Sequence, residues 1–102
     1  MLIRKKHKVI YATGAVNDIR EAKDWYNLQQ KDLGNRFLND VKSTILLVSE
    51  HPLSFTIKFG QIRMAICKVF PFAVHYEIDE ATYLIRVISV FHFSRKPFWL
   101  KD

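Results

Sequence analysis

Apolar residues recur at helical spacing near the start of the chain. Intervals of four, three and four residues place a set of apolar side chains on one helical face: Ala15, Ile19, Ala22 and Tyr26. This pattern predicts a helix over residues 15–29, with Thr13 as a candidate N-cap. Residues 8–12 precede it as a short strand candidate.

A longer apolar stripe follows a polar link at residues 29–32. Its members are three or four positions apart, and three more leucines widen it: Leu33, Phe37, Val41, Ile45 and Val48, with Leu38, Leu46 and Leu47. The stripe predicts a helix over residues 32–50, with Asp32 as candidate N-cap and Pro52 ending it. Because the link is short, the two helices are predicted to pack as an antiparallel hairpin.

The second half of the chain changes to strand patterns. Apolar runs occupy residues 55–59 and 62–70, on either side of Gly60. Residues 73–79 alternate, with one set predicted to face the helices and the other to face away: Val74, Tyr76 and Ile78 against His75, Glu77 and Asp79. Residues 83–92 are almost continuously apolar, which is typical of a central strand buried on both faces. Short links between these runs predict an antiparallel meander.

The predicted elements indicate an α+β fold in the order β-α-α-β-β-β, with room for one further strand. The apolar stripes of both helices need a common floor, so the hairpin is expected to cover one face of a three- to four-stranded antiparallel sheet. A chain of 102 residues is too short for two hydrophobic cores. Residues 1–102 are therefore predicted to form one domain.

The net charge of the chain indicates which classes of partner it would bind. The chain carries 16 Lys and Arg against 10 Asp and Glu, a net charge of +6. This balance favours nucleic acid, an acidic protein or anionic lipid, although simple solubility would also explain it. The sequence has no apolar window of transmembrane length and no signal core after its basic start, so a cytoplasmic location is expected. Cys67 is a single cysteine in an apolar run, which predicts a buried, inert thiol.

Two polar residues, Arg86 and His92, interrupt the most apolar strand. On an unbroken strand, side chains at even spacing point the same way, so these two are expected to share the face away from the helices. The polar side of the neighbouring strand would meet them there, whereas the sequence does not decide the side of Arg63. The candidates for one cationic, titratable patch are Lys58, Arg63, His75, Glu77, Arg86, His92 and Arg95.

Such a patch has the residue types of a metal-independent ribonuclease. A histidine or carboxylate can take the proton of a ribose 2′-hydroxyl, arginines can hold phosphates, and an exposed aromatic such as Trp99 can stack on a base. The candidate catalytic residues are Arg63, Glu77, Arg86 and His92. The alternative is a charged sheet face that only keeps the protein soluble and is covered by the C-terminal tail. The histidines and the single cysteine show no metal-ligand spacing, so no metal or cofactor is expected.

Several segments, in order, resemble the RelE/ParE toxin superfamily. Residues 15–26 are similar to its first helix and residues 33–41 to the start of its second. Four further segments resemble its strand region: Arg63-Met-Ala, Phe70-Pro71, Tyr76-Glu-Ile-Asp79 and Ile88-x-Val90-x-His92-x-x-Arg95-x-Pro97-x-Trp99. The resemblance covers residues 9–99. It implies the superfamily's fold and the toxin of a type II toxin–antitoxin pair, held inactive by an antitoxin protein.

The resemblance also implies one of two activities. ParE-like members inhibit DNA gyrase without being enzymes, and RelE-like members cut mRNA in the ribosome. The C-terminal motif and the first helix look more like the ParE and plasmid-stabilisation branch, which implies growth inhibition through gyrase. Arg63 matches the RelE-like pattern, but Phe98 and Trp99 stand where a closing tyrosine is common. Whether the chain is an enzyme therefore stays open, and a toxin fold that has lost its toxicity and persists as a binding module is a third reading.

Under each of these readings the same residues are expected to meet the antitoxin, gyrase, or the ribosome and its mRNA. They are Lys58, Arg63, His75, Arg86, His92, Arg95 and Trp99. No membrane partner is expected, and both a homodimer and a toxin–antitoxin hetero-oligomer are compatible with the sequence.

Overall fold

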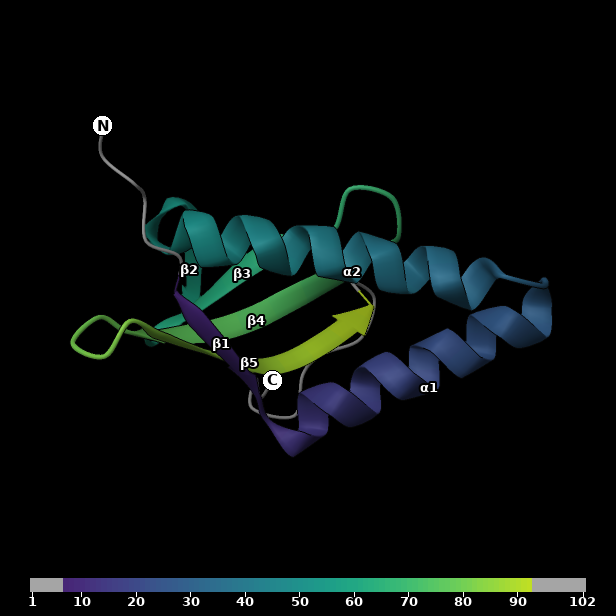
Figure 1. Ribbon diagram of the computed structural model, residues 1–102, viewed down its shortest axis with the longest axis horizontal. Coiled ribbons are helices and arrows are strands. Elements are labelled where there is room, and N and C mark those ends of the chain that lie inside the picture. Colours follow the sequence, from purple (N-terminus) through teal and green to yellow (C-terminus); the bar gives the residue numbers. More distant parts are fainter. Residues whose placement is uncertain (1–6, 93–102) are drawn as a thin grey trace.

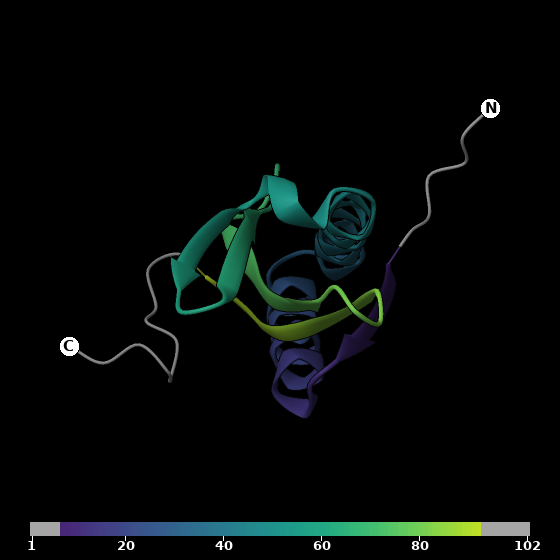
Figure 2. The same cartoon turned by 90° about the vertical axis from the view of Figure 1, so that its left-hand side faces the viewer.

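The computed structural model describes residues 7–92. Its elements are β1 (Lys8–Tyr11), α1 (Thr13–Gln29), α2 (Leu33–Glu50), the 3-10 turn η1 (Pro52–Ser54), β2 (Thr56–Phe59), β3 (Ile62–Ile66), β4 (Phe72–Asp79) and β5 (Leu84–His92). The helices form the predicted antiparallel hairpin, and both pack on one side of a twisted sheet (Figures 1 and 2). The other side of the sheet is called the open face below. Within residues 7–92, no helix is long and apolar enough to cross a membrane.

The sheet has five strands in the order β1-β5-β4-β3-β2. Strands β2 to β5 form the predicted antiparallel meander, but β1 pairs in parallel with β5. The sheet is therefore mixed and larger than the three or four antiparallel strands expected. The backbone N–H of Lys8 donates to the carbonyl of Tyr83 at 2.9 Å, a contact between the two ends of the described chain. The pattern of apolar and polar residues within one segment cannot predict the pairing of two strands so far apart in the chain.

The core lies between the hairpin and the sheet. The predicted stripe of α2 is buried there, and residues Phe37, Val41 and Val48 pack against Val74 and Tyr76 of β4. The α+β class and the covered face are thus as predicted. The prediction that three more leucines widen the buried stripe is wrong in part, because two of them, near the end of α2, are exposed: Leu46 and Leu47.

The turn between the helices is built differently from the sequence-based expectation. Asp32 makes no side-chain cap and instead adopts a left-handed conformation with φ 67°. The side-chain oxygen of Asn27 in α1 accepts a hydrogen bond from the backbone N–H of Gly34 at 2.7 Å. A Cβ at Gly34 would lie 2.4 Å from the carbonyl oxygen of Lys23, so only glycine fits where the helices meet. Thr13 likewise lies inside α1, after the N-cap residue Ala12, and caps nothing.

Candidate partner-binding site

A β-bulge in β5 decides which predicted site residues meet. His75 pairs with Ser89, whereas the next residue, Tyr76, pairs with Val87, so β5 holds one extra residue at Ile88. A bulge of this kind interrupts the alternation of side chains between the two sheet faces. Residues on either side of Ile88 therefore do not follow the even spacing assumed from the sequence.

The bulge separates Arg86 from His92. Before it, Arg86 lies opposite Glu77 on the open face. After it, His92 lies opposite Phe72, which belongs to the core beneath the helices, and their ring centroids are 5.5 Å apart. The expectation that Arg86 and His92 share a face is therefore wrong. A register shift set by the pairing with β4 is the physical reason.

Arg63 also lies away from the open face. It pairs with Tyr76 on the helix side of the sheet. Its guanidinium donates to the carbonyl oxygens of Phe55 at 2.7 Å and Leu53 at 3.3 Å, in the link between α2 and β2. Arg63 thus braces a chain segment and is not placed beside Arg86 to hold a phosphate.

His75 lies on the open face but is packed rather than solvated. It is 2% exposed, and its ring stacks on Phe91 with a centroid distance of 4.4 Å and an interplanar angle of 15°. Burial, and secondarily the positive charge of Lys58, lower the pKa of His75 from 6.5 to about 4. At neutral pH the imidazole carries no charge, so His75 does not contribute to a cationic patch.

The predicted patch does not assemble in the part of the chain that the structure describes. Arg86 and Glu77 remain neighbours on the open face, whereas Arg63 and His92 lie on the helix side. Arg95 and Trp99, and with them the expected cover of the open face by the C-terminal tail, lie outside the described residues. Residues 7–92 also contain no group of three His, Cys, Asp or Glu side chains placed to hold a metal ion.

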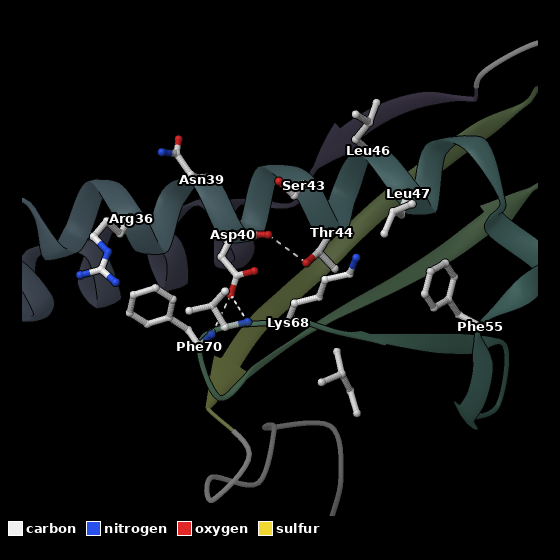
Figure 3. A pocket seen from close by; sticks show the side chains of 12 residues that line it. Arg36, Asn39, Asp40, Ser43, Thr44, Leu46, Leu47, Phe55, Lys68 and Phe70 are labelled. Carbon is white, nitrogen blue, oxygen red and sulfur yellow. Dashed lines mark hydrogen bonds between the residues drawn. The ribbon is translucent and has the colours of Figure 1, made fainter.

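A different surface has the properties of a binding site. A groove of about 730 Å³ runs between α2 and the loop from β3 to β4, and it is called the α2 groove here (Figure 3). Apolar side chains that are exposed to solvent line it: Leu46, Leu47, Ile66 and Val69. Arg36 and Lys68 add two positive charges to its walls. Exposed apolar side chains gathered in a hollow are typical of partner-binding surfaces.

Asp40 holds the loop wall of this groove in place. Its Oδ2 accepts hydrogen bonds from the backbone N–H groups of Val69 at 3.0 Å and Phe70 at 2.7 Å (Figure 3). The hydroxyl of Thr44 donates to the Asp40 carbonyl at 2.9 Å. The two bonds to Val69 and Phe70 hold the chain towards α2 after Ile66, which is consistent with β3 ending four residues before the predicted boundary at residue 70.

The groove also borders a strand edge. The pairing of β2 with β3 reaches Met64 and ends there. The N–H of Cys67 donates inward to the carbonyl of Phe72 at 2.9 Å. Backbone groups of successive strand residues point to opposite sides, so those of Ile66 point outward, past the last pairing with β2. An extended peptide segment can pair with such an edge.

The α2 groove is not among the sites predicted from the sequence. The signal was present in Leu46 and Leu47, two leucines beyond those that the core stripe of α2 needs. Helical periodicity predicts both as core positions, because it cannot tell a wider buried face from an exposed apolar strip.

Comparison with known proteins identifies the relatives of this chain. Residues 9–97 match the family described as the ParE toxin of the type II toxin–antitoxin system parDE. A comparison with curated protein sequences found no match.

Solved structures show the same fold. The chromosomal ParDE toxin–antitoxin system from P. aeruginosa aligns with a TM-score of 0.74 at 10% identity, covering 85% of this chain and 96% of that one. The intact RelBE complex of E. coli aligns with a TM-score of 0.67 at 15% identity, covering 87% and 99%. The RelBE2 complex of Mycobacterium tuberculosis gives 0.65 at 18% identity, covering 88% and 94%. Because the family match spans residues 9–97 of 102, this chain belongs to the ParE toxins of type II toxin–antitoxin systems, within the RelE/ParE superfamily.

Proposed function

We propose that this protein is a non-enzymatic toxin that inhibits growth by binding DNA gyrase. The observation that carries the proposal is that the four candidate nuclease residues do not form one group, since Arg63 and His92 lie on the helix side whereas Arg86 lies with Glu77 on the open face. A ribonuclease needs its proton acceptor and its phosphate-binding groups within hydrogen-bond reach of one substrate. The described arrangement favours the gyrase-binding reading over mRNA cleavage.

Two assays on the wild-type protein separate these readings. Purified toxin is expected to inhibit supercoiling by purified gyrase at micromolar concentration, and the 5′ ends of cellular mRNA are expected to stay unchanged after induction. New mRNA ends within translated regions, with supercoiling unaffected, would overturn the proposal in favour of the ribonuclease. Inhibition of neither process, with harmless overexpression, would instead support a binding module that has lost its toxicity.

The antitoxin is proposed to occupy the α2 groove. The structural relatives are toxin–antitoxin complexes, and this groove combines exposed apolar side chains, two cations and the outward-facing backbone of Ile66 at the end of β3. These features fit a segment that is apolar on one side and acidic on the other, in extended or helical form. A cytoplasmic location, a role in plasmid stabilisation and a toxin–antitoxin hetero-oligomer belong to the same proposal.

A pair of leucine substitutions tests the docking site. Leu47→Glu places a negative charge in the α2 groove, and it is expected to weaken binding of the antitoxin, taken as the product of the adjacent reading frame, by at least about tenfold. Leu28→Glu is the matched control, because Leu28 is 83% exposed on α1 and does not line the groove. Equal affinities of the two variants, measured by calorimetric titration, would place the antitoxin elsewhere.

A further inference from the structure

Asp40 is a buried carboxylate in the middle of α2. It is 8% exposed, although ionised side chains are rarely buried to this extent without compensation. The compensation comes from two main-chain N–H groups of one loop, those of Val69 and Phe70. Hydrogen bonds to a charged acceptor are about twice as strong as neutral ones. The placement of Asp40 is therefore explained by the loop that it holds.

The loop presents an apolar side chain to solvent at a fixed position. Val69 is 70% exposed, and it is one of the residues that line the α2 groove. Its backbone is bound to α2 through Asp40 while its side chain remains uncovered. An exposed loop residue would ordinarily sample several conformations, and a partner would have to order it on binding. The hydrogen bond from the Val69 N–H to Asp40 lowers that cost, because it holds the loop backbone before a partner binds.

The neighbouring residue secures the base of the loop independently. The ring of Phe70 packs on Tyr26 with a centroid distance of 4.9 Å and on Phe37 at 5.6 Å. These core contacts do not involve the Asp40 side chain. Loss of the carboxylate is therefore expected to loosen Val69 while Phe70 keeps the loop attached, so that the variant still folds.

We propose that Asp40 is a positioning residue for partner binding, which acts by holding Val69 as a preformed apolar anchor in the wall of the α2 groove. This inference rests on the proposal that the antitoxin occupies that groove. It adds that affinity depends on Asp40, which is only 8% exposed among the residues that line the groove and acts through the loop. The inference implies that the docked segment of the partner carries an apolar side chain, which contacts Val69.

A double-mutant cycle tests the inference. Asp40→Ala and Val69→Ala are each expected to weaken binding of the antitoxin by about tenfold in calorimetric titration. The double variant is expected to lose no more than either single variant, because Asp40 acts through Val69. Asp40→Asn has nearly the same shape and keeps one acceptor oxygen, so it is expected to restore part of the affinity lost in Asp40→Ala. Amide exchange at residue 69 should speed up in Asp40→Ala, while amides of the β4–β5 pairing keep their protection.

The outcomes distinguish this inference from the docking proposal. If Leu47→Glu weakens binding but Asp40→Ala and Asp40→Asn bind like the wild type, the docking site stands and the role of Asp40 is refuted. Fully additive losses in the double variant would also refute it, since a residue with a general structural role predicts additivity. If the wild type does not bind the antitoxin, or if Leu47→Glu binds normally, both proposals fail. If Asp40→Ala does not fold by circular dichroism, Asp40→Asn takes its place: a partial loss of affinity with faster amide exchange at residue 69 supports the role of Asp40, and wild-type values of both refute it.

Discussion

Replacing Gly34 by alanine is expected to destabilise the protein by about 2 kcal/mol. The added Cβ would lie 2.4 Å from the carbonyl oxygen of Lys23 and 2.6 Å from the side chain of Asn27. The first contact is with the backbone of α1, so it is relieved only when the two helices separate. Overpacking of this kind costs about 1–3 kcal/mol. The hydrogen bond from Gly34 to Asn27 would weaken as well, at about 1 kcal/mol, which roughly offsets the gain of up to about 1 kcal/mol in helix propensity.

Gly14→Ala is the matched control, because the same chemical change occurs near the start of the other helix. The nearest atom to its added Cβ is the carbonyl oxygen of Ile88 at 3.9 Å, an ordinary van der Waals contact. This variant is expected to be more stable than the wild type by about 0.5 kcal/mol, through helix propensity and a less flexible unfolded chain.

Thermal and urea unfolding followed by far-UV circular dichroism measure both effects. For a chain of this size, 1 kcal/mol corresponds to a shift of roughly 4–8 °C in Tm, so the Tm of Gly34→Ala should fall by about 10 °C or more. The Tm of Gly14→Ala should rise by a few degrees. If Gly34→Ala unfolds at the wild-type midpoint, the close approach of the helices at Gly34 is not a constraint and the reasoning fails.

Three further predictions concern single side chains. Burial raises the pKa of Tyr76 to about 12, and its protonated hydroxyl donates to the carbonyl of Pro52 at 2.6 Å. Tyr76→Phe should therefore lower the free energy of unfolding by about 1–2 kcal/mol in urea titrations. An unchanged unfolding midpoint would refute this prediction. Arg63→Ala should lower stability by about 1 kcal/mol without changing inhibition of supercoiling, whereas loss of inhibition in a folded variant would return Arg63 to the functional surface. Between pH 6.5 and 4 the unfolded chain binds a proton at His75 that the folded protein does not, so stability should fall as pH drops through this window, by roughly 2 kcal/mol at pH 4.5. His75→Phe, compared with the wild type at pH 7 and 4.5, should remove that part of the pH dependence, and an identical dependence in both proteins would contradict it.

Much of the fold follows from local patterns. The two helices appear in the sequence as a period of 3.6, and the four strands of the meander appear as short apolar or alternating runs. Both signals depend only on residues close together in the chain. The face of β4 towards the helices was predicted correctly from Val74 and Tyr76 for the same reason. The helical hairpin also followed, because a short link between two amphipathic helices leaves few other arrangements.

The grouping of the candidate site residues could not be predicted from local patterns. The expectation for Arg86 and His92 assumed unbroken alternation along β5, and the extra residue at Ile88 exists only relative to β4. His75 stacks on Phe91, which comes from the neighbouring strand. A face assignment made from one strand cannot include either effect.

The sequence by itself determined the family, the element order and the face of each helix that is buried. Only the tertiary structure decided that β1 closes the sheet in parallel beside β5, that Gly34 lets the helices touch, and that Asp40 holds the loop of the α2 groove. The element order and the buried helix faces depend on side-chain periodicity within each segment, and the family depends on the resemblance of several segments in order. The features decided by the tertiary structure depend on pairs such as Asp40 and Val69, which are 29 residues apart and meet only when separate elements pack together.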